Sequence, residues 1–330
     1  DFAQKRRSPL LAAGHLDPEW VDYNRPIQGG PTALGFDRFF GIAASLNQPP
    51  WCFIEDDRTA GVPTVERVKT AEFVEGMPPG LMVPDWDDEV VDLRFAEEAE
   101  RFIRDSCKRV RADGSNTGHG HSGNEVHGGN SPAPFFAYLA LSAPHPPWCP
   151  LEEVRGASGI GPRGDLVVLV DRIVGRVRSV LEELGVAQDT IVVVTSDNGG
   201  HSCAEFEREA YGHAVNGDLR GYKSQIFDGG HRVPLVISWP AVLAAGTRSD
   251  ACVCLMDLFA TLAELLDVPL PAGAGEDRVS FFHALMEAGH SVRPIATAAD
   301  RRTLVHHSGR GRFALRRGDW KLVDAADSGA

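Results

Sequence analysis

The stretch LRGYKSQIFDGGHRVPLVISW, residues 219–239, places one lysine and three glycines directly before an apolar run. The run at residues 233–239 is continuous rather than alternating, as expected of a strand buried on both faces of a parallel sheet. Glycines allow tight backbone turns, so Lys223 would stand at a sheet edge as a fixed cation for a sulfate or phosphate oxygen. For this stretch alone, an exposed surface lysine is the alternative.

Two further apolar runs, at residues 135–141 and 191–195, share this continuous character. Between them, residues 165–184 carry apolar side chains at helical spacing up to Gly185, which predicts a helix that ends there. Strand, helix and strand in this order are typical of a crossover between parallel strands. We therefore predict an α/β fold with a doubly wound, mostly parallel sheet and helices on both faces.

The C-terminal part of the chain has a different pattern. Residues 255–266 predict an amphipathic helix, which the prolines that follow would end. Residues 313–316 and 320–323 predict two antiparallel strands of a hairpin. We therefore predict a small C-terminal α+β subdomain at residues 269–330.

The remaining chain, residues 1–268, is predicted to form one large α/β domain. Within it, residues 111–132 contain glycines and histidines but almost no apolar side chains, which predicts a flexible insertion. Histidines of this insertion offer a transition-metal site as an alternative to a solvated loop.

The formal net charge of −13 over 330 residues argues against general affinity for nucleic acid or an anionic membrane, because those partners bind clustered cations. No stretch approaches the roughly 18 to 20 apolar residues of a membrane span. An anionic substrate would therefore need a local positive site. The six cysteines lack the spacing of a structural zinc site and suggest mostly buried thiols. No pattern sets the oligomeric state.

The other two apolar runs also end in reactive groups. His145 follows the first run between prolines, which stiffen the backbone around it. Asp197 and Asn198 follow the second run and offer hard oxygen ligands suited to Ca²⁺ or Mg²⁺; an Asx turn or a helix cap is the alternative. Because ligands gather beyond the carboxyl ends of strands in open α/β sheets, these groups and Lys223 predict a binding site there.

Together these motifs resemble those of the type I sulfatases of the alkaline-phosphatase superfamily, closest to the bacterial branch. The resemblance covers nearly the whole chain except the histidine-rich insertion. It rests on GGPTALGFDRFFG at 29–41, PHPPW at 144–148, SDNGGH at 196–201, LRGYK and DGGHRVP within 219–234, and GDWKL at 318–322.

The resemblance implies a role for each matching residue. Asp197 and Asn198 would be ligands of a divalent cation, most often Ca²⁺ with Mg²⁺ as the alternative. Lys223 and His145 would contact the sulfate and the bridging oxygen, and one of them would protonate the leaving alcohol. His201 would line the substrate pocket without an assigned role. The substrate would be a small-molecule or glycan sulfate ester, and a periplasmic or secreted location is expected.

Two departures from the family pattern stand out. Asp228 stands where the family commonly has glutamate, which shortens an orienting carboxylate by one methylene with little expected consequence. The sequence also lacks the family's early aspartate pair, its Cys-x-Pro-Ser-Arg segment and its Gly-Lys-Trp-His segment. We therefore expect an N-terminally truncated sulfatase whose formylglycine nucleophile lies in a missing portion, and which is inactive alone.

Two alternatives remain at this stage. A phosphodiesterase or phosphonate hydrolase of the same superfamily would use the same metal pair and lysine on phosphoryl oxygens. A non-catalytic pseudo-enzyme would bind sulfated ligands without turnover. Aryl sulfate and aryl phosphate turnover by the protein distinguishes these three possibilities.

Overall fold

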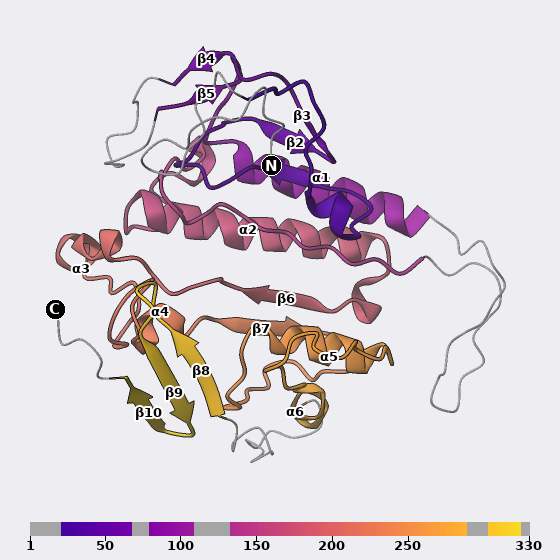
Figure 1. Ribbon diagram of the computed structural model, residues 1–330, viewed down its shortest axis with the longest axis vertical. Coiled ribbons are helices and arrows are strands. Elements are labelled where there is room, and N and C mark those ends of the chain that lie inside the picture. Colours follow the sequence, from indigo (N-terminus) through magenta and orange to yellow (C-terminus); the bar gives the residue numbers. More distant parts are fainter. Residues whose placement is uncertain (1–20, 68–78, 109–132, 289–302, 325–330) are drawn as a thin grey trace. The chain divides into compact units, whose positions relative to one another are not determined.

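The structure is a computed structural model, and the chain divides in it into two compact units, Asp1–Leu184 and Gly185–Ala330 (Figure 1). This division lies within the predicted domain of residues 1–268, and the predicted boundary after residue 268 stays a prediction. The predicted insertion at 111–132 lies outside the described residues. The residues that the structure describes are 21–67, 79–108, 133–288 and 303–324.

The first unit combines short antiparallel strands with two long helices. Strands β1, β2 and β3 form one antiparallel sheet, and β4 and β5 form an antiparallel pair. The elements of this unit are η2 Pro31–Leu34, β1 Phe40–Ile42, β2 Phe53–Glu55, β3 Arg58–Thr59, β4 Val65–Glu66, β5 Leu81–Met82, α1 Val91–Lys108, η3 Glu152–Val154 and α2 Pro162–Glu183.

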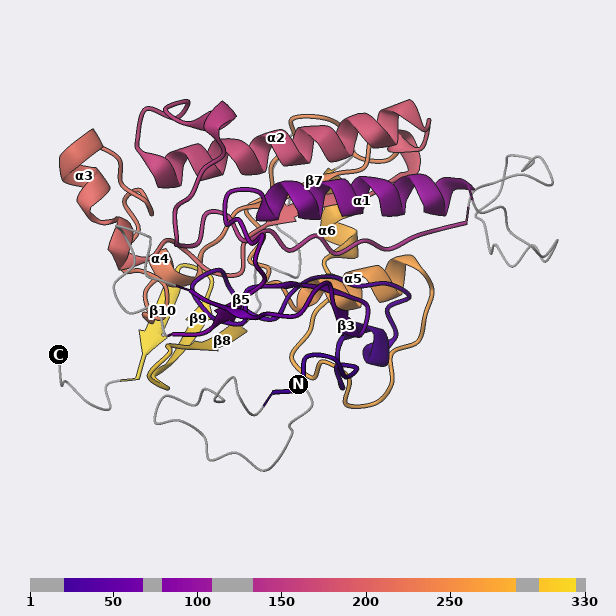
Figure 2. The ribbon, with the colours of Figure 1, turned by 90° about the horizontal axis from the view of Figure 1, so that it is seen from above.

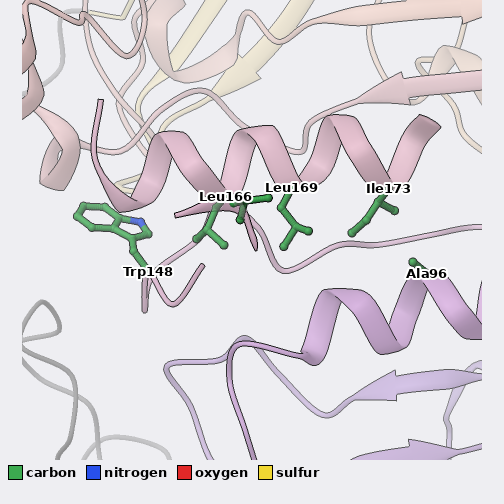
Figure 3. Packing of buried hydrophobic residues seen from close by; sticks show 6 residues of the cluster. Ala96, Trp148, Leu166, Leu169 and Ile173 are labelled. Atoms are coloured by element: carbon green, nitrogen blue, oxygen red, sulfur yellow. The ribbon is translucent and has the colours of Figure 1, made fainter. Parts of the chain in front are cut away.

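Helices α1 and α2 lie side by side and form the core of the first unit (Figures 1 and 2). Helix α2 begins with a proline at its first turn, where the missing N–H costs nothing. It then presents Leu166, Leu169 and Ile173 toward Ala96 of α1, with Trp148 beside the start of α2 (Figure 3). The helix predicted at residues 165–184 is therefore confirmed.

The strand predicted at residues 135–141 is wrong. This segment pairs with no strand in the described part of the chain. Leu139 and Leu141 instead pack against the apolar clusters around α1 and α2. Phe136 and Tyr138 of the same run are 61% and 79% exposed, so this continuous apolar run does not mark a strand buried on both faces.

The second unit also pairs its strands in the antiparallel sense. Its elements are η4 Ala187–Asp189, β6 Val192–Thr195, η5 Ser202–Ala204, α3 Phe206–Tyr211, α4 Asp228–His231, β7 Leu235–Ser238, α5 Asp257–Leu265, α6 Phe282–Ala288, β8 Thr303–His307, β9 Phe313–Arg317 and β10 Trp320–Val323. Helix α5 confirms the helix predicted near residues 255–266. Within the described ranges, no helix is both long and apolar enough to span a membrane.

Strands β6 and β7 correct the predicted sheet. The two predicted runs do form strands, but these pair antiparallel, with Val193 opposite Ile237. The connection between them carries only helices of six and four residues, whereas parallel neighbours usually require a longer crossover helix. The class is α/β with antiparallel sheets, and no doubly wound parallel sheet is present among the residues described.

The C-terminal sheet, in the order β10-β9-β8, confirms the predicted hairpin. Its two faces are unusual in composition. Val305, Leu315 and Leu322 form one cross-strand row on the exposed face. Arg316 and Lys321 are paired on the opposite, less exposed face. Antiparallel sheets ordinarily bury the apolar face, whereas the covered face here carries this charged pair beside the buried Ala314.

The packing of α2 generates a stability prediction. Ile173 is 1% exposed, whereas Val167 on the same helix is 45% exposed. The substitution Ile173→Ala should lower the free energy of unfolding of the first unit by about 2–5 kcal/mol, because it leaves a cavity. Val167→Ala should change it by less than about 0.5 kcal/mol. Chemical denaturation measures both changes in the free energy of unfolding, and hydrogen exchange of the α2 amides shows that the transition belongs to the first unit. Equal losses of stability in the two variants would contradict the described core.

Candidate active site

The loop that carries His145 is fixed by a buried carboxylate at the start of α1. The backbone N–H of Ser142 donates to Asp92 Oδ1 at 2.6 Å, and that of Ala143 donates to Oδ2 at 2.9 Å. Asp92 is 5% exposed. Burial raises the pKa of Asp92, and the two backbone hydrogen bonds partly offset that effect. The segment that leads to His145 is thus held at two successive amides.

The hydrogen bonds of His145 define which of its ring nitrogens is left to contact a ligand. Its backbone N–H donates to the Ser142 carbonyl at 2.9 Å. Its ring Nδ1 lies 2.7 Å from the Pro146 carbonyl, which can only accept, so Nδ1 carries the proton. In the neutral ring Nε2 is therefore the acceptor, and it has no partner among the described residues of the first unit. His145 is half-buried.

In the second unit, β6 ends in the loop that contains Asp197 and Asn198. The Asn198 side-chain Nδ2 donates to the Gly199 carbonyl at 3.0 Å. The Asp197 carboxylate and Asn198 Oδ1 have no hydrogen-bond partner within the part of this unit that the structure describes. These unengaged carboxylate and amide oxygens are the donor type that Ca²⁺ and Mg²⁺ prefer. The two residues therefore fit the predicted role of metal ligands.

Asp197 and Asn198 supply only part of a metal coordination shell. Among the residues that the structure describes, no group of three or more His, Cys, Asp or Glu side chains converges on a common point. Asn198 would add an amide oxygen to the carboxylate of Asp197. The metal role of Asp197 and Asn198 stays a prediction.

Lys223 lies directly against this loop through the backbone. Its N–H donates to the Gly200 carbonyl at 2.9 Å, and its side chain is half-buried. No carboxylate of the described residues forms an ion pair with the Lys223 ammonium. A half-buried ammonium without a protein anion is a favourable partner for a sulfate oxygen.

Asn216 joins the two loops and was not identified from the sequence. Its Oδ1 accepts from Gly200 N–H at 2.8 Å, and its Nδ2 donates to the Gly221 carbonyl at 2.8 Å. The Asp197 loop and the Lys223 loop are thus tied by one amide. A single asparagine in a glycine-rich segment has no pattern that would reveal this contact.

The Gly229–Gly230 turn packs against both the Asp197 loop and the Lys223 loop. Gly199 N–H donates to the Gly230 carbonyl at 3.1 Å, and Gly229 N–H donates to the Arg220 carbonyl at 2.8 Å. A Cβ atom on Gly199 would lie 1.8 Å from the Gly229 carbonyl oxygen. Glycine is therefore required by close backbone approach at this point.

The preceding residue, Asp228, is held by two cations of the C-terminal sheet. Lys321 Nζ donates to Oδ1 at 2.7 Å, and Arg316 Nη1 donates to Oδ2 at 3.0 Å. Burial alone would raise the pKa of Asp228, but the hydrogen bonds and charges of Lys321 and Arg316 outweigh it and lower the pKa. Neither cation was among the residues that the sequence singled out for the site.

His201 has a structural contact in this unit. It is exposed, and its ring Nδ1 accepts from Cys203 N–H at 3.1 Å at the start of η5. The structure thus places His201 as a helix cap. Its predicted position in the substrate pocket stays a prediction.

A polar pocket lies between α3 and the segment that leads to Lys223. Glu205 and Tyr222 interact by a hydrogen bond, and the pKa of Tyr222 is raised by loss of solvent and by the Glu205 carboxylate. Both signs of charge and several hydrogen-bonding groups line the pocket. Its polar lining residues are Glu205, Arg208, His213, Asn216 and Tyr222.

Comparisons with known proteins point to the sulfatases. The family model described as Sulfatase matches residues 121–268. The N-acetylgalactosamine-6-O-sulfatase of Bacteroides thetaiotaomicron is 28% identical and aligns with 94% of this chain and 61% of its own length. The human steryl-sulfatase is 35% identical over 46% of this chain and 25% of its own length.

A solved structure supports the same relationship. It comes from work on the metabolism of multiple glycosaminoglycans by Bacteroides thetaiotaomicron and superposes with a TM-score of 0.72 at 25% identity. It covers 92% of this chain and 64% of the solved chain. These comparisons support the resemblance of the chain to the type I sulfatase family of the alkaline-phosphatase superfamily. The chain spans about three fifths of the length of the bacterial relative.

The Asp92 contacts predict how the His145 loop responds to substitution. Asp92→Ala would leave two part-buried N–H groups without acceptors, which should destabilise the first unit by about 1–3 kcal/mol and broaden the His145 ring resonances. Asp105→Ala removes an exposed ion pair with Lys108 on the same helix and should cost less than about 1 kcal/mol. Denaturation and NMR measure both effects. Unchanged His145 resonances in Asp92→Ala would contradict the role of this carboxylate.

His306 predicts acid sensitivity of the second unit. Its Nε2 is buried without a partner, and its ring centroid lies 4.4 Å from that of His231. Burial and the nearby Lys321 charge lower the pKa of His306 from 6.5 to about 4. The unfolded chain therefore binds a proton at His306 more readily than the folded chain does. The contribution of neutral His306 to the stability of the folded unit is full above pH 6.5 and is lost as the pH falls toward 4.

Melting of the chain between pH 7 and pH 4.5 tests this assignment. His306→Gln should reduce the loss of melting temperature on acidification. His283→Gln, at a side chain that is 84% exposed, should leave the loss as it is. An identical pH dependence in wild type and His306→Gln would refute the prediction.

Proposed function

We propose that the protein hydrolyses sulfate monoesters with the help of a divalent cation. The observation that carries this proposal is the half-buried Lys223 ammonium, which has no carboxylate partner among the described residues and is joined through Gly200 to the loop of Asp197 and Asn198. One loop offers oxygen ligands and the other a fixed cation. A sulfate ester needs both kinds of partner.

The residues of the chain act on different atoms of the ester. A cation bound by Asp197 and Asn198 would polarise the sulfate group. Lys223 would hold a sulfate oxygen through a charge-assisted hydrogen bond, which strengthens as negative charge develops. His145, with Nδ1–H already engaged by Pro146, would use Nε2 to donate a proton to the leaving alcohol when the ring is protonated.

A sulfated sugar is the substrate class that we propose. The bacterial relative is named an N-acetylgalactosamine-6-O-sulfatase, and the pocket beside Tyr222 offers polar groups suited to hydroxyl-rich ligands. A periplasmic or secreted location is proposed with it, as expected for this family. For the whole protein, a doubly wound sheet of the superfamily type remains part of the same proposal.

The nucleophile is the group that these 330 residues do not supply. None of the six cysteines is followed by Pro-Ser-Arg, the segment whose cysteine becomes formylglycine in the family. We therefore propose that the 330-residue chain alone has no sulfatase activity. Turnover of an aryl sulfate by the purified chain would overturn this part of the proposal.

The protein expressed from its complete reading frame tests the activity itself. Lys223→Met should lower kcat/KM for an aryl sulfate by about 10²–10³, the usual effect of removing one group that stabilises the transition state. Lys108→Met, at an exposed lysine of α1, serves as the control and should leave kcat/KM unchanged. Equal activity of Lys223→Met and wild type would refute the role of Lys223, and faster turnover of an aryl phosphate would favour the phosphoryl alternative.

A further inference from the structure

We propose that Lys321 and Arg316 of the C-terminal sheet are positioning residues for the sulfate and cation loops. They would act through the Asp228 carboxylate, which begins the helical turn beneath those loops. This inference rests on the proposed function, because the two loops are named for the ligands proposed to bind there. The contacts that carry it are present without any bound ligand.

The first contact is between the C-terminal sheet and Asp228. Lys321 Nζ donates both to Asp228 Oδ1 and to the Ile226 carbonyl, at 2.7 and 2.6 Å. The Lys321 side chain is only 16% exposed. A hydrogen-bonded charge pair that is shielded from water holds its geometry more firmly than an exposed pair. Lys321 therefore fixes the backbone before Asp228 and the carboxylate itself.

The second contact is between Asp228 and the two glycines that follow it. The Asp228 carbonyl accepts from Arg232 N–H at 2.7 Å and closes the turn of α4. Gly229 is packed so closely that a Cβ atom on it would lie 2.1 Å from the Gly221 carbonyl oxygen. With no free space at this point, a shift of Asp228 would displace its neighbours instead of being absorbed.

The third contact is between the glycine turn and the two functional loops. Gly230 accepts from Gly199 N–H, next to Asn198. Gly229 donates to the Arg220 carbonyl, three residues before Lys223. One turn thus sets the backbone position of both the oxygen ligands and the lysine.

The sheet pattern supports a role beyond ordinary packing. The register pairs Leu304 with Arg316 and Arg316 with Lys321 in one row across the sheet. Both cations of this row donate to Asp228, whereas apolar side chains occupy the exposed face. Beside the buried Ala314, the covered face therefore contributes directed charge, which fixes the position of the Asp228 carboxylate.

Hydrogen exchange of the 330-residue chain tests the coupling. Lys321→Met should accelerate exchange of the Gly199, Lys223 and Gly229 amides at least about tenfold, without accelerating exchange of Val193 in β6. Arg317→Met is the matched control, because Arg317 lies next to Arg316 on β9 but is exposed, and it should leave all four amides unchanged. Acceleration of all amides alike, or of none, would overturn the inference.

Anion binding separates positioning from a merely structural role. Inorganic sulfate, titrated against the chain and followed by NMR at the Lys223 amide, should bind at least about fivefold more weakly to Arg316→Met and Asp228→Asn. Asp228→Glu retains the carboxylate and should restore binding to within about twofold of wild type. Unchanged sulfate affinity in Asp228→Asn would contradict the inference.

The outcomes also distinguish this inference from the proposed function. Selective exchange changes in a chain whose wild type does not bind sulfate would support the coupling and count against the sulfate site. If wild type binds sulfate but the variants show no selective exchange changes, the sulfate site would be supported and the coupling would be contradicted. If Lys321→Met fails to fold, the comparison of Asp228→Asn with Asp228→Glu decides the coupling by the same exchange measurement.

Discussion

The contact on which the candidate site depends is the backbone packing of the Gly229–Gly230 turn against Gly199. Its hydrogen bond from Gly199 to Gly230 joins the loop of the predicted metal ligands to the segment that carries Lys223. Any side chain at Gly199 would collide with the Gly229 carbonyl. Because Gly199 has no side chain, the loop of Asp197 and Asn198 can lie directly against the glycine turn that also contacts the segment of Lys223.

One carboxylate in each unit performs the same task. Asp92 fixes the loop of His145 by accepting from two successive amides, and Asp228 fixes the glycine turn while it is held by Lys321 and Arg316. In each case the functional side chain lies on a loop, and a carboxylate on a neighbouring element orders that loop. Such ordering keeps reactive groups in place without placing the carboxylate on the substrate.

Local patterns in the sequence predicted individual helices and strands better than the contacts between them. The apolar spacing before Gly185 was sufficient for α2, because helical periodicity is a local property. The parallel direction predicted for β6 and β7 was wrong, since an apolar run carries no information about the direction of its neighbouring strand. Motifs identified Lys223 and Asn198, whose chemistry is evident from residue type. Asn216 and Lys321 were missed because their roles arise only from contacts between segments distant in sequence.

A crystal structure of the 330-residue chain grown with calcium and sulfate tests the central claim most directly. The account predicts calcium bound by oxygens of Asp197 and Asn198, and sulfate within hydrogen-bond distance of Lys223 Nζ, with the Gly199–Gly230 hydrogen bond intact. A Lys223 side chain paired with a protein carboxylate, together with Asp197 and Asn198 oxygens turned away from each other and without calcium, would contradict it.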